Sequence, residues 1–175
     1  MIEVVTGRSY ENFVRDEIFV PLRMRESVFF AEDAITRPVA AGHSVHGRVE
    51  PGWTLPRVSF AAGQITSSAA DMLIYGRFML GDGVPLLSSR AMHMLITPTV
   101  DVGGAQGGSH SCGLSWFLRG GGGGGGGGGG SVGDSGDGDF GGAPAGLRIC
   151  HGGATNGQLS GFALHRVGSE SLIIN

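Results

Sequence analysis

The sequence predicts an α/β (α+β) fold in which helices pack on an antiparallel sheet, and two observations lead to it. The C-terminal stretch divides into three short apolar or alternating segments, which are Leu147–Cys150, Leu159–Val167 and Ser171–Asn175. Only a few residues separate these segments, whereas a parallel crossover needs about a dozen or more. The three strands are therefore expected to form an antiparallel meander. Upstream of them, three segments have the periodicity and the end signals of helices.

Each predicted helix begins at a serine that can serve as its N-cap. Ser9 precedes an amphipathic segment, and Ser68 stands in capping-box spacing with Asp71. Pro21 is expected to end the first helix, and Gly81 the second. The predicted helices are Tyr10–Phe19, the segment between Ser68 and Gly81, and Arg90–Ile96 capped by Leu86-Leu87-Ser88-Ser89.

The remaining segments are predicted to be loops, with two exceptions. Leu22–Val58 has no sustained period and is expected to be a long loop with one or two short strands, such as Ala40–Val45. Gly113–Leu118 is an apolar strand. Residues 120–145 begin with eleven glycines, Gly120–Gly130, which lose too much backbone entropy on ordering to be fixed without contacts. They are predicted to be a flexible insert, and about 150 residues remain for one domain.

Composition narrows the classes of partner and cofactor. The net charge is −3, and the twelve basic residues, all arginine, form no basic stripe, so nucleic acid is not an expected partner. No apolar run is long enough for a membrane span. Cys112 and Cys150 form neither a disulfide framework nor a metal site, and both are expected to be reduced and buried. His43 and His46 lie in a Gly-flanked loop without a third ligand, so no metal or other cofactor is predicted.

Two short catalytic motifs occur out of context. Gly133-Asp134-Ser135-Gly136 spells the sequence around the nucleophile of trypsin-like proteases, but it lies in low-complexity sequence without the upstream His and Asp. Tyr10-Glu11-Asn12 matches the Y-x-N of serine β-lactamases. Because Tyr10 belongs to the apolar face of a predicted helix, core packing is the better interpretation.

His151-Gly152-Gly153 is the candidate site, because it follows directly after a predicted strand. An imidazole there can hold a substrate carboxylate or carbonyl, and the two glycines leave the strand edge open to an acyl group. Spacing alone favours a structural histidine, so the functional interpretation depends on further context.

That context is the order of segments, which resembles the class C β-lactamase-like serine hydrolases, including penicillin-binding-protein-like peptidases and many esterases. Thr6–Met24 is similar to their "TG-x-SY…IF-x-PLGM" helix, and Ala61–Asp71 to their "AAGG…STA-x-D" segment. Leu86-Leu87-Ser88, Thr97-Pro98 and Cys112–Trp116 match the next helix and the "YGLGW" strand, and His151-Gly152-Gly153 falls at the third motif, K-T-G or H-x-G.

The resemblance implies a β-lactamase/transpeptidase-like fold and acyl transfer to a serine, followed by hydrolysis of an ester, amide or β-lactam. It implies that His151 is catalytic and that Gly152 and Gly153 bind a small-molecule or peptide acyl substrate in the full-length parent. The S-x-x-K nucleophile motif requires a lysine, which the chain lacks, and Y-x-N would lie upstream of Met1. Residues 1–175 are therefore interpreted as a partial domain, truncated at the N-terminal side and inactive alone. The alternative is a degenerate, non-catalytic binding or interaction domain.

Overall fold

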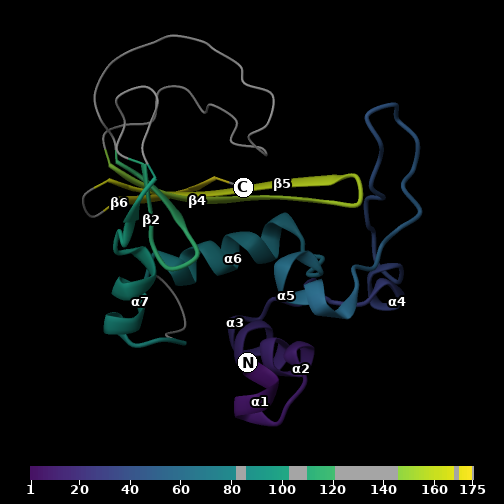
Figure 1. Cartoon of the computed structure of the whole chain (residues 1–175), viewed down its shortest axis with the longest axis horizontal. Helices are drawn as coiled ribbons and strands as arrows, with labels where there is room; N and C mark the ends of the chain where they lie inside the picture. Colours follow the sequence, from purple (N-terminus) through teal and green to yellow (C-terminus); the bar gives the residue numbers. More distant parts are fainter. Residues whose placement is uncertain (82–85, 103–109, 121–145, 168–169, 175) are drawn as a thin grey trace. The chain divides into compact units, whose positions relative to one another are not determined.

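The computed structural model of the chain describes residues 1–81, 86–102, 110–120, 146–167 and 170–174. The chain divides into two compact units, shown in Figure 1, which are Met1–Leu86 with Ala154–Leu159, and Leu87–Gly153 with Ser160–Asn175. Most of the glycine-rich insert, 121–145, lies outside the described residues, and the Gly133-Asp134-Ser135-Gly136 motif lies there with it.

Short helices make up most of the first unit. They are α1 (Ile2–Thr6), α2 (Tyr10–Val14), the π-helical turn η1 (Arg15–Phe19), α3 (Val20–Leu22), α4 (Ala31–Ala34), the 3₁₀ turn η2 (Arg57–Ser59), α5 (Phe60–Gly63) and α6 (Ala69–Met79). Two predicted caps are confirmed, because Ser9 Oγ accepts a hydrogen bond from Asn12 N at 3.3 Å and Ser68 Oγ from Asp71 N at 3.2 Å. Gly81 follows α6 in the left-handed region with φ 86°, as a helix-ending glycine does.

The predicted helix end at Pro21 is wrong. Helical backbone continues from Tyr10 through Leu22, and it ends at Arg23 with a left-handed φ of 63°. Pro21 lies in the first turn of α3, where its missing N–H costs no hydrogen bond. The preceding π-helical turn changes the hydrogen-bond spacing just before the proline, and such turns accommodate irregularities inside helices.

Two buried polar side chains of the first unit hold loop backbone in place. The Asp71 carboxylate, 3% exposed, accepts hydrogen bonds from Glu26 N at 2.8 Å and Ser27 Oγ at 2.7 Å. The Gln64 amide donates to Phe29 O at 2.8 Å and accepts from Leu55 N at 2.7 Å. These contacts fix much of Leu22–Val58, the predicted loop. The short strand predicted at Ala40–Val45 is wrong, since its only pairing there is the single bridge His43↔Val49.

The second unit contains one helix and a sheet. Its elements are α7 (Ser89–Ile96), β1 (Val100–Asp101), β2 (His110–Cys112), β3 (Phe117–Gly120), β4 (Leu147–Thr155), β5 (Gln158–Val167) and β6 (Glu170–Ile174), with the tip of the β4–β5 hairpin grouped with the first unit. The six described strands lie in the order β1-β2-β3-β4-β5-β6, so each is hydrogen-bonded to its neighbour in sequence. The mixed helix and sheet composition and the antiparallel meander are thereby confirmed.

The sheet contains the most deeply buried side chains. Leu118 lies directly opposite Ile149 in the β3–β4 register, and each is 1% exposed; Leu164 on β5 is 0% exposed. Full burial of such a side chain contributes about 1.5–3 kcal/mol to folding. The strand predicted at Gly113–Leu118 is wrong at its start, because Gly113–Trp116 form the turn between β2 and β3. Among the described residues, no helix has the length and apolar character to cross a membrane.

Candidate functional site

His151, Gly152 and Gly153 lie in the interior of β4, so the prediction that they follow the end of a strand is wrong. β4 continues to Thr155, and the chain reverses at Asn156-Gly157, where φ is 47° and 74°. Positive φ at both central residues is the requirement of a type I′ hairpin turn, and Asn-Gly is its preferred sequence. The turn therefore comes four residues later than the glycine pair suggested.

The interior position still leaves one edge of the motif uncovered by strand β3. The β3–β4 register ends at Phe117↔Cys150, and the chain before Phe117 belongs to a turn. The backbone groups of His151–Gly153 consequently extend past the end of β3 on one edge of β4, while β5 is the neighbouring strand on the other edge. This is the geometry in which an extended ligand can add hydrogen bonds to a sheet edge.

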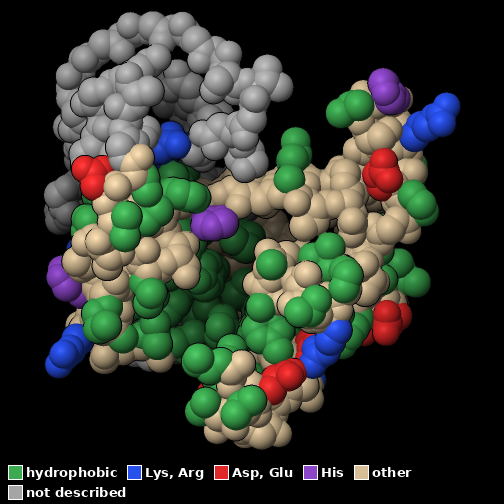
Figure 2. Space-filling model, viewed as in Figure 1, with side chains coloured by type: hydrophobic (Ala, Val, Ile, Leu, Met, Phe, Trp, Pro, Cys, Tyr) green, Lys and Arg blue, Asp and Glu red, His purple; other side chains and the backbone are tan. Residues whose placement is uncertain are grey.

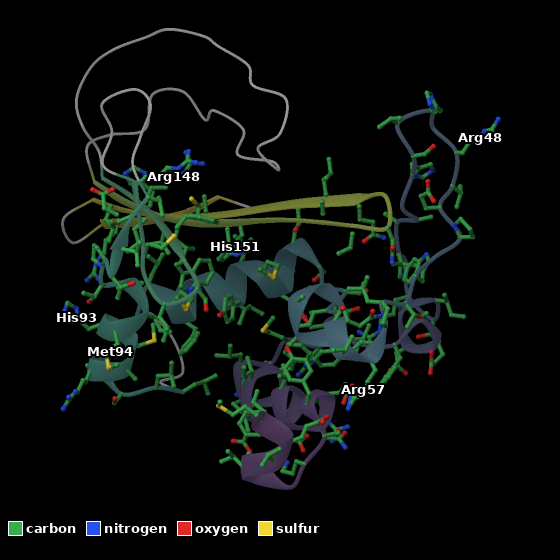
Figure 3. The ribbon with its side chains drawn as sticks, in the orientation of Figure 1. Arg48, Arg57, His93, Met94, Arg148 and His151 are labelled. Carbon is green, nitrogen blue, oxygen red and sulfur yellow. The ribbon has the colours of Figure 1, made fainter. Side chains whose placement is uncertain are left out.

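The His151 side chain is exposed, and two aromatic rings orient it. The ring centroids lie 6.3 Å from Trp116 at an interplanar angle of 89° and 5.7 Å from Phe117 at 35°. His151 Nδ1 is 2.6 Å from Gly152 O. Since a carbonyl oxygen only accepts, Nδ1 carries the proton in this contact, which leaves Nε2 of the neutral ring as an acceptor. Figure 3 shows the ring projecting from β4.

Gly153, two residues after the histidine, leaves room for the side chain of Ser160 on β5. A Cβ at this position would lie 3.1 Å from Ser160 Oγ, tighter than an ordinary van der Waals contact. Gly152 and Gly153 are both half-buried. The structure thus brings the three predicted site residues together, with small residues next to the imidazole.

Trp116 and Phe117 were not predicted as site residues, although Trp116 occupies the tryptophan of the "YGLGW" match. Trp116 also contacts Phe162 of β5, with ring centroids 6.0 Å apart, so it connects the turn before β3 to the sheet. The available indication in the sequence was an aromatic pair, Trp116-Phe117, at the start of a strand. Contact across strands is a long-range property that spacing along the chain does not report.

A cavity in the first unit was also missed. Its volume is about 30 Å³, room for a water molecule or two. Its polar lining includes Gln64, Thr66, Thr155 and Gln158. Both ends of the Gln64 amide already hydrogen-bond to backbone, so this side chain holds the surrounding loops in place and is not left free to bind a ligand in the cavity.

Tyr10 of the Y-x-N match packs as the alternative interpretation predicts. Its ring lies 5.5 Å from Phe29 in an edge-to-face arrangement, and burial raises the pKa of its phenol. Glu11, next in the match, is buried and forms an ion pair with Arg57. Tyr10 is thus half-buried against an aromatic neighbour, and Glu11 is held in an ion pair, so both side chains have structural contacts.

Comparison with known proteins agrees with this architecture. The family model described as Beta-lactamase matches residues 1–158. Penicillin-binding protein 4 of Amycolatopsis lactamdurans is 34% identical over 89 residues, which are 48% of this chain and 23% of that protein. The octameric penicillin-binding protein homologue from Pyrococcus abyssi superimposes on this chain with a TM-score of 0.66 and 20% identity. The match covers 95% of this chain and 32% of the homologue's chain.

These matches concern part of each relative, since the chain spans 23% of the length of the first and 32% of the second. The structural neighbour has the same mixed fold, with an antiparallel sheet and packed helices. The family match covers the strand that carries His151, Gly152 and Gly153. The chain is therefore a member of the β-lactamase family of serine-hydrolase-related domains, which includes the penicillin-binding protein homologues.

Proposed function

We propose that these 175 residues are the C-terminal portion of a longer β-lactamase-related serine hydrolase, whose reaction is acyl transfer from an ester, amide or β-lactam to a serine. The observation that carries the proposal is the strand edge at His151–Gly153, which extends beyond β3 and displays an oriented imidazole. In the proposed enzyme, this edge binds the acyl part of a small-molecule or peptide substrate.

The proposed roles follow from the geometry. Backbone groups of Gly152 and Gly153 would hydrogen-bond to an extended substrate, as an added strand does. His151 would position the substrate through Nε2, which accepts a hydrogen bond when Nδ1 donates to Gly152 O and donates one when the ring is protonated. The contacts with Trp116 and Phe117 limit the rotation of the ring.

The chain alone is proposed to be inactive, because its sequence contains no lysine. In the S-x-x-K motif a lysine accepts the proton of the serine nucleophile. Without this partner, a serine hydrolase loses several orders of magnitude of rate and keeps only binding and orientation. The nucleophile motif and Y-x-N would then belong to residues outside these 175.

Activity measurements on two lengths of protein test the proposal. The 175-residue chain should show neither a burst nor turnover with a chromogenic β-lactam or a p-nitrophenyl ester, and a fluorophosphonate should label no serine. A longer in-frame protein that includes S-x-x-K should show both signals. In that protein His151→Ala should lower turnover, while His93→Ala, an exposed histidine on α7, should leave it unchanged.

The second candidate is a non-catalytic binding domain, which the absence of lysine also favours. Reading the transcript upstream of Met1 separates the two. An in-frame S-x-x-K and Y-x-N support the hydrolase, and a transcript without them supports the binding domain. Stoichiometric labelling of a serine in the short chain, Ser135 included, would contradict the proposal that the nucleophile lies outside these 175 residues.

A further inference from the structure

The candidate site has an apolar side, formed by the two aromatic residues at the start of β3. Phe117 ends the register of β3 with β4, opposite Cys150, which directly precedes His151. The phenyl ring is 44% exposed, although its centroid lies 5.7 Å from that of the imidazole at an interplanar angle of 35°. An exposed aromatic ring is therefore located where the uncovered edge of β4 begins.

Trp116 forms a second wall beside the imidazole and is fixed by the sheet. Its ring lies 6.3 Å from that of His151 at an angle of 89°, and 6.0 Å from that of Phe162 on β5. Phe162 is only 8% exposed, and Trp116 is half-buried. Because Trp116 contacts both the core and the imidazole, little of its freedom remains to be lost when a ligand binds.

A ligand that hydrogen-bonds to His151 comes within reach of both rings. Such a bond places the ligand atom about 3 Å from Nε2. The centroids of Phe117 and Trp116 are both within 6.3 Å of the centre of the imidazole. A substituent a few bonds away from the bonded atom can therefore pack against the exposed ring of Phe117.

The two rings favour an apolar substituent at this place. Covering the exposed part of Phe117 removes apolar surface from water, which is favourable. An amide or a carboxylate placed against the same carbon atoms would lose hydrogen bonds to water and gain none from the rings. A second aromatic ring gains more than its buried area, since aromatic pairs attract in offset and edge-to-face arrangements.

We propose that Phe117 is a specificity-determining residue, which makes the site prefer acyl groups with an aromatic or bulky apolar substituent. The substituent packs on Phe117 beside Trp116, while the backbone of Gly152 and Gly153 holds the acyl chain at the strand edge. This inference rests on the proposed function, because it names the substrate class of the same site.

Binding of two neutral probes to the 175-residue chain tests the preference. N-acetylphenylalaninamide and N-acetylglutaminamide share one backbone and differ in whether the side chain is aromatic or polar. The NMR resonance of His151 Cε1 reports binding next to the imidazole and not elsewhere on the chain. The wild type should bind the phenylalanine probe about 3- to 10-fold more tightly, the range expected for one added aromatic contact.

Substitutions at one position separate specificity from a structural role. Phe117→Ala should remove the preference, so that the two probes bind alike, whereas Phe117→Tyr keeps the ring and should retain it. Phe117→Leu preserves more of the side-chain volume, serves if the alanine variant does not fold, and should reduce the preference. Met94→Ala is the matched control and should bind both probes as the wild type does. Met94 is 56% exposed on α7, apart from His151 in Figure 3.

An alanine variant that weakens both probes equally would overturn the inference, because Phe117 would then act only on the structure of the site. Tighter binding of the glutamine probe to the wild type, or a His151 resonance that moves with neither probe, would overturn it too. Turnover of the longer in-frame protein decides the proposed hydrolase separately. Turnover without a preference removes the specificity and keeps the reaction, and a preference without turnover does the reverse.

Discussion

Two glycines of one loop, Gly42 and Gly52, differ in the space around their α-carbons. A Cβ on Gly42 would overlap the backbone oxygen of Asn156, and none of the described atoms lies within 4 Å of one on Gly52. The loop approaches the hairpin turn here, since His43 N donates to Gly157 O at 2.9 Å. Gly42→Ala should therefore lower the free energy of unfolding by about 1–3 kcal/mol, the cost of overpacking.

Gly52→Ala is the matched control and should change stability little, because the added methyl group meets open space. Urea denaturation followed by circular dichroism measures both variants. Equal midpoints for the two variants would contradict the close approach of this loop to the turn.

Glu3 gives the first unit a dependence on pH. The hydrogen bond from Tyr10 N to the Glu3 carboxylate, together with the ion pair to Arg57 at 2.6 Å, lowers the pKa of Glu3 below its ordinary 4.5. Folding thus favours the ionised form. Its contribution to stability is complete above the unfolded pKa, near 4.5, and is lost as the pH falls through the lower folded-state pKa.

The wild type should therefore lose melting temperature more steeply than Glu3→Gln as the pH falls from 5 toward 3. The two melting curves should converge at the acid end, where both side chains are neutral. The measurement is thermal unfolding at a series of pH values and low salt, because exposed ion pairs are screened. A constant difference between the two proteins across this range would argue against the carboxylate as the cause.

At the residue scale, local features could be predicted and long-range ones could not. The caps Ser9 and Ser68 were correct because a cap joins residues three apart in sequence. The hydrogen bonds of Asp71 to Glu26 and Ser27 join residues about 45 apart, so capping-box spacing identified Asp71 as a helix residue and missed its contact with the loop.

At the scale of the elements, the register of β2, β3 and β4 predicts how the two cysteines react. Cys112 is opposite Phe117, and Phe117 is opposite Cys150, so an entire strand separates the cysteines. Two strand spacings are roughly 10 Å, beyond the reach of about 7 Å for a disulfide. Cys150 is 1% exposed, as predicted, but Cys112 is only half-buried, which corrects the expectation that both are buried.

A thiol reagent should therefore label Cys112 readily in the native protein and Cys150 only at the rate of unfolding. Labelling followed by mass spectrometry measures the two rates, and Cys112→Ser serves as the control that isolates Cys150. Rapid native labelling of Cys150, or a disulfide on non-reducing electrophoresis, would contradict the register.

Element types could be predicted more reliably than element ends. The alternation of Leu159–Val167 identified a strand, and β5 contains it. The glycine pair after His151 was interpreted as a strand end, although Asn156-Gly157 is the stronger hairpin sequence and sets the actual turn. Pro21 was likewise interpreted as the end of a helix. It lies instead in the first turn of α3, because the effect of a proline depends on the hydrogen bonds of the turn around it.

For the molecule as a whole, the order of motifs predicted the family and fold because each motif is tied to one element of it. The functional site was predicted only in part. His151, Gly152 and Gly153 are adjacent in sequence, whereas Phe117 of β3 and Trp116 of the turn before it contact the imidazole from a distant part of the chain.

The N-terminal helices of the first unit expose apolar side chains, visible in the lower part of Figure 2, and this predicts how the 175-residue chain behaves in solution. Met1 is 100% exposed, Val4 88%, Val5 77% and Val20 63%. Contiguous exposed apolar surface favours association, while single apolar residues on a surface are ordinary. We therefore expect the chain to associate as its concentration rises.

Val4→Glu with Val5→Gln should reduce this association without lowering the melting temperature, since α1 has no buried residue among Ile2–Thr6. Val45→Glu is the control, because Val45 is 97% exposed in a loop away from α1 and should leave association unchanged. Sedimentation velocity over a concentration series measures all three proteins. A wild-type chain that stays monomeric throughout and melts in one sharp transition would contradict the prediction, and would favour a self-contained domain over a portion of a longer hydrolase.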